Sequence, residues 1–300
     1  MKQWTKKFAV ASLAAALAIS LPTALQAEAR EKIRIGCSPS PHAEILEHLK
    51  PDFEAAGLDV EVVVFTDYDT PNRALDDGDI DANYFQHVPY LEDFCEKNQL
   101  NLEVLCGVHL EPMAVFSARY KSLDEVQEGD EVFIPNDTVN GARALLILQA
   151  EGLIELDPKS GLEATEKDII KNEKKLKFRA MDAVQIPHSY EDAALAVING
   201  NYAIENGLDP IKDSVAIEGK SSPYVNVVAV RKGEVDKEAF VKLKKVLLSD
   251  KVSEFIKERY DGAVVAAAYD PETDKLDSVK EDQAKADAHD TTEMDAKESK

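Results

Sequence analysis

Short apolar runs alternate with segments of helical spacing from about residue 30 onward. The run KIRIG (32–36) has the length and composition of a short buried strand. In residues 43–56 the apolar side chains recur at helical spacing, but Pro51 interrupts them, so a kinked or split helix is expected. VEVVVF (60–65) then predicts a second strand. This strand–helix–strand order favours a parallel sheet.

The same alternation continues to about residue 259 and predicts an α/β protein. Further strands are predicted at 80–85, 102–108, 111–117, 131–135, 177–181, 192–198 and 224–231. Further helices are predicted at 71–77, 88–98, 140–149, 201–207, 236–248 and 250–259.

The N-terminal segment has the pattern of a targeting sequence. Lys2, Lys6 and Lys7 precede an apolar run at 8–21, which is too short for a comfortable membrane span. We therefore expect a cleaved signal peptide over 1–27 and a periplasmic or extracytoplasmic protein; an uncleaved anchor is the alternative. No cysteine lies near the expected cleavage site, so this segment offers no point of lipid attachment.

Composition and charge exclude some partners. A chain of 300 residues is long enough for one large domain or two lobes with separate cores. Its net charge of −22 argues against a surface that neutralises phosphates, so no nucleic-acid partner is expected. Charge repulsion of this size favours a soluble monomer. Residues 270–300 are acidic and poor in aromatic and branched apolar side chains, which predicts a disordered tail.

The three cysteines, Cys37, Cys95 and Cys106, contain no CxxC pair, so a zinc site or dithiol motif is not expected. Their spacing permits a disulfide between Cys95 and Cys106 without showing one. We favour the interpretation that all three are small buried apolar residues.

Aromatic and imidazole rings are concentrated between residues 65 and 91, although only 7% of the chain is aromatic. The rings belong to Phe65, Tyr68, Tyr84, Phe85, His87 and Tyr90. Turn formers divide this stretch into short elements. The rings are therefore either a packed core or the wall of a ligand pocket at the ends of strands.

Motifs of catalysis are missing from the sequence. It has no Gly-rich phosphate loop, no GxSxG elbow and no histidine spacing typical of a metal site, so catalytic residues, cofactors and metals are not predicted. Polar residues suited to binding are present instead. Arg143 lies one turn into a predicted helix and is placed to hold a carboxylate in a bidentate fork.

Asparagines add hydrogen-bonding groups to this arginine. Asn199 and Asn201 lie at a strand–helix junction, where asparagine is usually an N-cap but can instead contact a ligand. Asn226 lies inside a predicted strand, which disfavours asparagine unless it has a polar partner. One cation, several amides and an aromatic cluster suit a small zwitterion with an apolar side chain.

Five segments together resemble the methionine-binding lipoproteins, the solute receptors of bacterial methionine ABC importers. They are residues 41–94, 111–125, 135–154, 196–210 and 222–231, and they include FTDY, NYFQHVPY, NDTVNGARALLIL and SPYVN. The resemblance covers roughly residues 33–266.

The resemblance implies a two-lobed periplasmic-binding-protein fold, type II-like, with mixed sheets flanked by helices and a hinge between the lobes. Lobe 1 would comprise 31–112 plus 225–268, and lobe 2 would comprise 113–224. The chain would cross between lobes near Glu111–Val115 and Tyr224–Val228.

The resemblance also implies a ligand site. The side chain of the ligand would be enclosed by four rings, those of Tyr68, Phe85, His87 and Tyr90. Arg143 would hold the ligand carboxylate, and Asn201 and Asn226 would hydrogen-bond its backbone ends. A thioether suits aromatic walls because sulfur is polarizable. Phe65 and Tyr84 would then be packing residues.

The implied function is capture of methionine for a membrane ABC permease with its ATPase. A related amino acid or a short peptide is the alternative ligand, and an enzyme acting on amino acids is less well supported. The chain departs from the family in lacking the lipid-anchored cysteine after its signal, and in the loop GCSPSPH (36–42). The choice between L and D ligands stays open.

Overall fold

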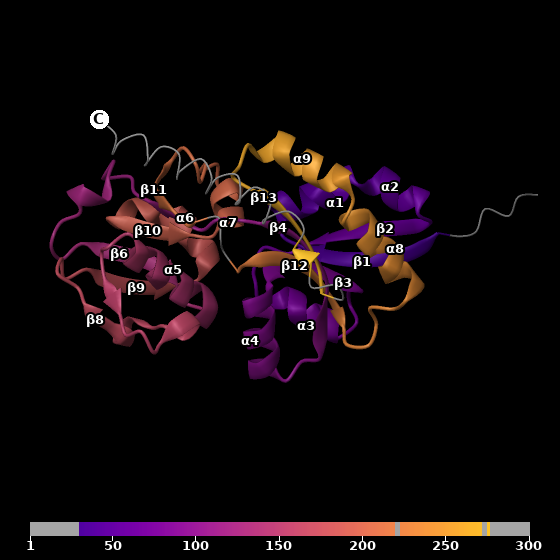
Figure 1. Ribbon diagram of the computed structural model, residues 1–300, viewed down its shortest axis with the longest axis horizontal. Coiled ribbons are helices and arrows are strands. Elements are labelled where there is room, and N and C mark those ends of the chain that lie inside the picture. The colour runs from indigo at the N-terminus through magenta and orange to yellow at the C-terminus, as the bar shows by residue number, and fades with distance from the viewer. Residues whose placement is uncertain (1–29, 220–222, 272–274, 277–300) are drawn as a thin grey trace, which may run out of the picture.

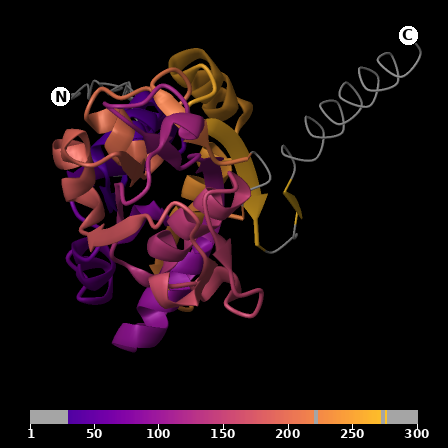
Figure 2. The same ribbon diagram turned by 90° about the vertical axis from the view of Figure 1, so that its left-hand side faces the viewer.

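The computed structural model describes residues 30–219, 223–271 and 275–276. The expected signal peptide (1–27) lies outside these residues, and so does the expected tail (270–300) except for 270–271 and 275–276. Within the described part, no helix is long and apolar enough to cross a membrane. Figure 1 shows two lobes side by side along the long axis, and Figure 2 views the molecule along that axis.

The first lobe is built on a seven-stranded mixed sheet with the order β14-β13-β4-β12-β3-β1-β2. Its strands are β1 (Glu31–Cys37), β2 (Leu58–Val64), β3 (Ala82–His87), β4 (Leu102–Leu110), β12 (Val225–Arg231), β13 (Val265–Asp270) and β14 (Lys275–Leu276). β1 pairs in parallel with β2 and β3, as the strand–helix–strand pattern predicts. β12 is antiparallel to both of its neighbours, β3 and β4.

Helices cover both faces of this sheet. They are α1 (Glu44–His48), α2 (Lys50–Ala55), α3 (Thr70–Asp76), α4 (Val88–Asn98), α8 (Glu238–Leu247) and α9 (Asp250–Tyr260), with a turn of π-helix (Pro39–Ala43) before α1. Alternate residues of β12 face opposite layers. Val228 and Val230 pack with α1, α2, α8 and α9, whereas Val227 and Ala229 pack with α3 and α4. The helix predicted over 43–56 is split next to Pro51, as expected.

The second lobe has a five-stranded sheet with the order β11-β5-β10-β6-β9. Its elements are β5 (Ala114–Phe116), β6 (Glu131–Pro135), α5 (Thr138–Ala150), β9 (Lys177–Met181), α6 (Ile186–Ser189), β10 (Leu195–Ile198), α7 (Gly200–Glu205) and β11 (Ser214–Ile217), beside a small sheet of β7 (Glu155–Leu156) and β8 (Ile169–Lys171). Short 3-10 turns lie at Leu123–Glu125, Gly161–Glu163, Glu166–Asp168, Ala183–Gln185 and Tyr190–Asp192. α5 packs on one face of the sheet, and α6 and α7 pack on the other.

Two segments connect the sheets. The first, 111–113, joins β4 to β5, and the second, 218–224, joins β11 to β12. The strand predicted over 111–117 therefore begins only at Ala114, because 111–113 span the gap between the lobes. The strand predicted over 192–198 likewise begins at Leu195, after a 3-10 turn.

Three strands of the main sheets, β11, β13 and the two-residue β14, were not predicted from the sequence. β13 is rich in alanine, a residue depleted in strands, and it forms because it packs along β4. Tyr269 lies opposite Gly107, where a Cβ added to the glycine would lie 2.8 Å from the Tyr269 Cβ. β11 is a four-residue edge strand, too short to give a clear alternating pattern.

Candidate functional site

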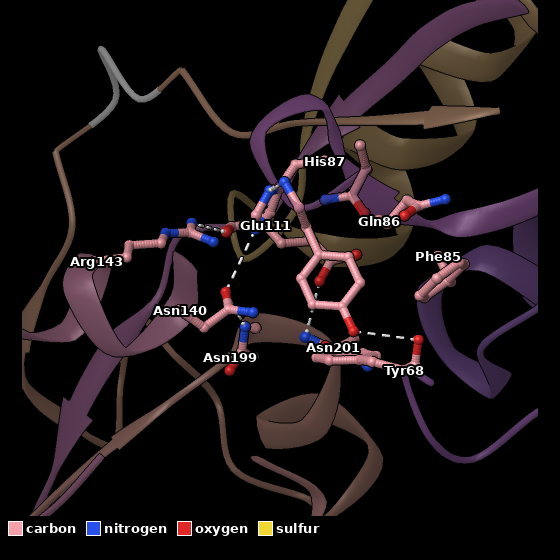
Figure 3. A pocket seen from close by; sticks show the side chains of 12 residues that line it. Tyr68, Phe85, Gln86, His87, Glu111, Asn140, Arg143, Asn199 and Asn201 are labelled. Atoms are coloured by element: carbon pink, nitrogen blue, oxygen red, sulfur yellow. Dashed lines mark hydrogen bonds between the residues drawn. The ribbon is translucent and has the colours of Figure 1, made fainter. Parts of the chain in front are cut away.

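A small pocket lies between the lobes, beside Glu111 of the first crossing segment. Twelve residues line it: Tyr68, Phe85, Gln86, His87, Tyr90, Glu111, Asn140, Arg143, Asn199, Gly200, Asn201 and Asn226. The structure thus brings together all seven residues that the sequence analysis selected. Figure 3 shows side chains of both lobes converging there. The cavity measures about 20 Å³, which is room for about one water molecule.

Aromatic rings form one wall of the pocket. The ring centroid of Tyr68 lies 5.9 Å from that of Phe85 and 5.8 Å from that of Tyr90. Phe85 ends up beside Tyr90 because β3 runs straight into α4, whose first turn contains Pro89. The Tyr68 hydroxyl reaches across the cleft and donates to Asn201 Oδ1 at 2.5 Å. Tyr84, in contrast, is fully buried in the core, as expected for a packing residue.

His87 occupies the junction of β3 and α4 and caps the helix. Its Nδ1 accepts a hydrogen bond from the backbone N–H of Tyr90 at 3.3 Å, so we assign its proton to Nε2, which lies 3.3 Å from Asn140 Oδ1. Burial, reinforced by the positive charge of Arg143, lowers the pKa of His87 to about 3. The imidazole is therefore neutral at physiological pH.

Replacing His87 by asparagine should remove one proton-linked contribution to stability while keeping a capping oxygen. Because the folded-state pKa is depressed, neutral His87 contributes stability above its usual pKa near 6.5, and this contribution is lost as pH falls toward 3. The difference in free energy of unfolding between wild type and His87→Asn should therefore change by about 1.4 kcal/mol per pH unit between pH 6 and pH 4. Urea denaturation across that range measures it, and parallel curves would contradict the assignment.

Asn140 and Asn199, which are not among those seven residues, complete the polar side of the pocket. Asn140 Oδ1 accepts from Asn199 Nδ2 at 2.9 Å, which fixes the orientation of the Asn199 amide. Asn199 is at the N-cap position of α7, but its side chain makes no cap hydrogen bond. Its buried Oδ1 has no partner among the described residues. An unpaired buried acceptor at a pocket wall is suited to a ligand donor.

Arg143 is almost fully buried and already has a carboxylate partner. Its Nε donates to Glu218 Oε1 at 2.9 Å and its Nη2 donates to Glu218 Oε2 at 2.5 Å. Nη2 also donates to the backbone oxygen of Glu111 at 2.8 Å, and the Tyr224 ring lies 4.2 Å from the guanidinium carbon. The expected fork therefore exists, but a residue of the chain itself occupies it. No sequence pattern indicates Glu218, which lies 75 positions away.

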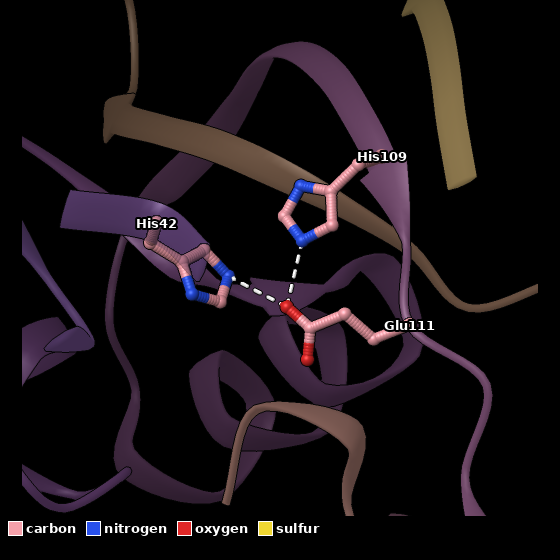
Figure 4. A group of neighbouring side chains, drawn as sticks. All are labelled: His42, His109 and Glu111. Atoms are coloured by element: carbon pink, nitrogen blue, oxygen red, sulfur yellow. Dashed lines mark hydrogen bonds and ion pairs between the residues drawn. The ribbon is translucent and has the colours of Figure 1, made fainter. Parts of the chain in front are cut away.

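Behind the pocket, Glu111 joins two buried histidines from the first lobe (Figure 4). Its Oε1 lies 2.6 Å from His109 Nε2 and 3.3 Å from His42 Nε2, while its Oε2 accepts from the Asn201 backbone N–H at 2.9 Å. Nδ1 of His42 has no partner among the described residues, so we assign the proton to Nε2, which also reaches Asn226 Oδ1 at 3.0 Å. Asn226 consequently directs its Nδ2 away from His42.

The three ligand-type atoms of this cluster lie within 4.8 Å of one another, a donor set of a kind that binds zinc. Their present separations are hydrogen-bond lengths, and both histidines share Oε1 as acceptor. Burial lowers the pKa of His42 to about 4 and that of His109 to about 3, and it raises the pKa of Glu111. We interpret the cluster as a hydrogen-bonded support for Asn201 and Asn226.

A protein-family model described as NlpA lipoprotein matches residues 33–268. This chain belongs to the NlpA lipoprotein family. Among its relatives, the probable D-methionine-binding lipoprotein MetQ of Vibrio cholerae serotype O1 is 42% identical over 235 residues, which cover 78% of this chain and 87% of the relative. The family expected from the sequence is therefore confirmed.

Solved structures of NlpA-type proteins show the same fold. A nutrient binding protein from Burkholderia cenocepacia, bound to methionine, is 40% identical with a TM-score of 0.76, covering 78% of this chain and 99% of that one. A periplasmic substrate-binding protein of an ABC transporter from Coxiella burnetii is 37% identical with a TM-score of 0.75, covering 78% and 100%. The two-lobed periplasmic-binding-protein fold is confirmed, and these names describe binding proteins, not enzymes.

The NlpA-type pocket of this chain depends on a glycine at the start of α7. A Cβ on Gly200 would lie 2.9 Å from the Glu111 Cβ and 3.2 Å from the Pro112 carbonyl oxygen. Gly200→Ala should therefore push α7 away from Glu111 and cost about 1–3 kcal/mol of folding free energy. Thermal unfolding measures this, with Gly219→Ala as control because no described atom lies within 4 Å of its added Cβ. Equal transition midpoints would contradict the close packing.

Another network of this NlpA-family protein supports the pocket from the first lobe. Asn72, Asn83 and Gln86 are buried, at 0%, 0% and 3% exposure. Asn72 Oδ1 accepts from Asn83 Nδ2 at 2.8 Å and from Gln86 Nε2 at 2.7 Å, and Asn72 Nδ2 donates to Gln86 Oε1 at 2.8 Å. The triad thus satisfies its own amides and fixes Gln86 in the pocket wall.

The thiols of this family member are all free. Cys37 and Cys106 are buried in strands of the first lobe, and burial raises the pKa of each to about 12. Cys95 is half-buried on α4. The disulfide considered between Cys95 and Cys106 is absent, in agreement with the favoured interpretation.

Proposed function

We propose that this protein captures methionine between its lobes and delivers it to the membrane permease and ATPase of an ABC importer. The observation that carries the proposal is one pocket that combines an aromatic wall, a buried arginine and a buried unpaired amide oxygen. These groups match the apolar side chain, the carboxylate and the ammonium of a methionine zwitterion. The names of the relatives support the same ligand and the same kind of transporter.

The proposed ligand contacts follow from the hydrogen bonds already made. Asn226 Nδ2 points away from His42 and is a donor for the ligand carboxylate, together with Arg143. Asn199 Oδ1 is the acceptor for the ammonium group, and the carboxylate of Glu111 lines the same pocket. The thioether would then pack against Tyr68, Phe85 and Tyr90, a contact that sulfur favours at ring edges. Asn201, held by Glu111 and Tyr68, would orient the second lobe around the ligand.

Entry of the ligand requires the lobes to separate. A cavity of about 20 Å³ holds about one water, whereas an amino acid is several times larger. Among the described residues, 111–113 lie on the first crossing between the two main sheets, and 218–219 with 223–224 lie on the second, so we propose that these residues belong to the hinge. Lobes with the proposed bounds 31–112 plus 225–268 and 113–224 would close around the ligand.

Isothermal titration calorimetry of unfolded and refolded protein tests the proposal, because unfolding removes ligand that copurifies. We expect micromolar or tighter binding of L-methionine or D-methionine, and much weaker binding of leucine and glutamate. Correctly refolded protein that binds neither methionine enantiomer would overturn the proposal. Tighter binding of another amino acid or of a methionyl dipeptide would favour the alternative ligands.

Delivery of the ligand implies a protein outside the cytoplasm that acts as a monomer. The relatives are named as lipoproteins and as a periplasmic protein. Export by a cleaved signal and the lack of a lipid anchor stay predictions, because 1–29 lie outside the described residues. Mass spectrometry of the mature protein from membrane and soluble fractions tests both.

A further inference from the structure

Glu218 does not line the pocket, yet it determines how Arg143 is held. Both bonds of the fork, from Nε and from Nη2, end on its two carboxylate oxygens. The side chains of Arg143 and Glu218 are only 4% and 12% exposed. A bidentate pair between two planar groups fixes the guanidinium plane as well as its position.

Two further contacts enclose the guanidinium. The Glu111 carbonyl oxygen takes the second hydrogen of Nη2, and the Tyr224 ring covers one face. Among the described residues, Nη1 is then the guanidinium nitrogen that makes no hydrogen bond. Because Arg143 lines the pocket, Nη1 is the nitrogen left for a ligand.

Glu218 is itself anchored at the proposed hinge. Its backbone N–H donates to the Met113 carbonyl at 2.8 Å, and its Oε2 accepts from the Met113 N–H at 3.3 Å. Met113 is fully buried, so moving the Glu218 carboxylate away would leave a buried N–H without a partner. A ligand carboxylate that displaced Glu218 would leave the Met113 N–H unpaired, at a cost in binding free energy. A carboxylate that binds Nη1 leaves this hydrogen bond intact.

We propose that Glu218 is a positioning residue for ligand recognition, which holds Arg143 so that only Nη1 meets the carboxylate of the bound amino acid. The inference rests on the proposed function and adds a basis for specificity. Nη1 offers only N–H donors, so it suits a free carboxylate. Asn226 Nδ2 is the second donor to this carboxylate. An amide or a peptide bond has an oxygen for only one of the two donors and brings its N–H against the other, which disfavours blocked amino acids and peptides extended at the carboxyl end.

The test compares L-methionine with L-methioninamide, which differ only at the carboxylate. Both are titrated calorimetrically into refolded wild type, Glu218→Gln and Glu218→Asp. Gln keeps the shape but loses the charge, and Asp keeps the charge but is too short to reach both Nε and Nη2. We expect each variant to bind L-methionine at least tenfold more weakly, and L-methioninamide within threefold of wild type. Glu234→Gln, which alters a separate Arg–Glu pair in the first lobe, should change neither affinity.

The other outcomes overturn the inference in different ways. Equal losses for both ligands would assign Glu218 a general structural role. Tighter binding of L-methionine by Glu218→Gln would show that Glu218 competes with the ligand. A wild type that binds no methionine would overturn the proposed function and this inference with it. If Glu218→Gln lacks a cooperative thermal transition, Glu218→Asp, which preserves the buried charge pair, decides alone.

Discussion

Arg143→Met is expected to weaken binding of L-methionine at least about thirtyfold. The substitution keeps much of the side-chain volume and removes the cation that the ligand carboxylate needs. Truncating one member of a buried charge pair costs about 2–5 kcal/mol, and every 1.4 kcal/mol corresponds to a factor of about ten in affinity. Calorimetric titration of refolded protein measures the loss directly.

The same variant should also be less stable without ligand. Glu218 would keep a nearly buried carboxylate whose partner is gone, and the Glu111 carbonyl would lose its donor. Breaking a buried pair in this way costs about 3–5 kcal/mol, which urea denaturation can measure. Arg179→Met is the matched control, because Arg179 is exposed on β9 and does not line the pocket. A loss of affinity of less than tenfold for Arg143→Met would mean that other groups hold the carboxylate.

Asn72→Ala is expected to lower the free energy of unfolding by about 3 kcal/mol, since each buried polar group left unpaired costs about 1–3 kcal/mol. The substitution would leave Gln86 Oε1 without its donor, and Asn83 Nδ2 would keep only its 3.3 Å bond to the Pro71 carbonyl. Because Gln86 lines the pocket, affinity for methionine should fall as well, by a smaller factor.

Urea denaturation of Asn72→Ala and of the exposed Asn101→Ala measures the effect. Asn101→Ala should lie within about 0.5 kcal/mol of wild type, as is usual for exposed positions. If Asn72→Ala were equally neutral, water entering the triad would be satisfying the freed amides, and the network would not hold Gln86 in place.

Sequence patterns predicted most elements because local signals agree with the fold. The bounds expected for 88–98, 131–135 and 177–181 are those of α4, β6 and β9. In α4, Pro89 lies in the first turn, where its fixed φ suits a helix, and Gln99 ends the helix in the left-handed conformation, at φ 59°. β13 shows the opposite case, since its alanines adopt a strand only through pairing with β4.

In the candidate site, too, local sequence signals predict some residues, whereas others come together only through the fold. The rings at 68–90 are close in sequence, and their spacing alone indicates a cluster. His42 is far in sequence from His109 and Glu111, so no local spacing indicates that the three side chains are in contact. Glu218 could not be predicted for a similar reason, because its pairing with Arg143 depends on how β11 leads into the second crossing.

The three thiols differ in burial, so a thiol reagent is expected to label the folded protein at one cysteine, Cys95. Cys37 and Cys106 are fully buried with strongly raised pKa values, whereas Cys95 is half-buried on α4. Thiolate is the reactive form, so a maleimide dye would attach to Cys95 first. The helix that carries Cys95 begins at the pocket with His87 as its cap and Tyr90 in its first turn. The fluorescence of a dye on Cys95 would therefore report closure of the lobes, and no cysteine would have to be introduced by mutation.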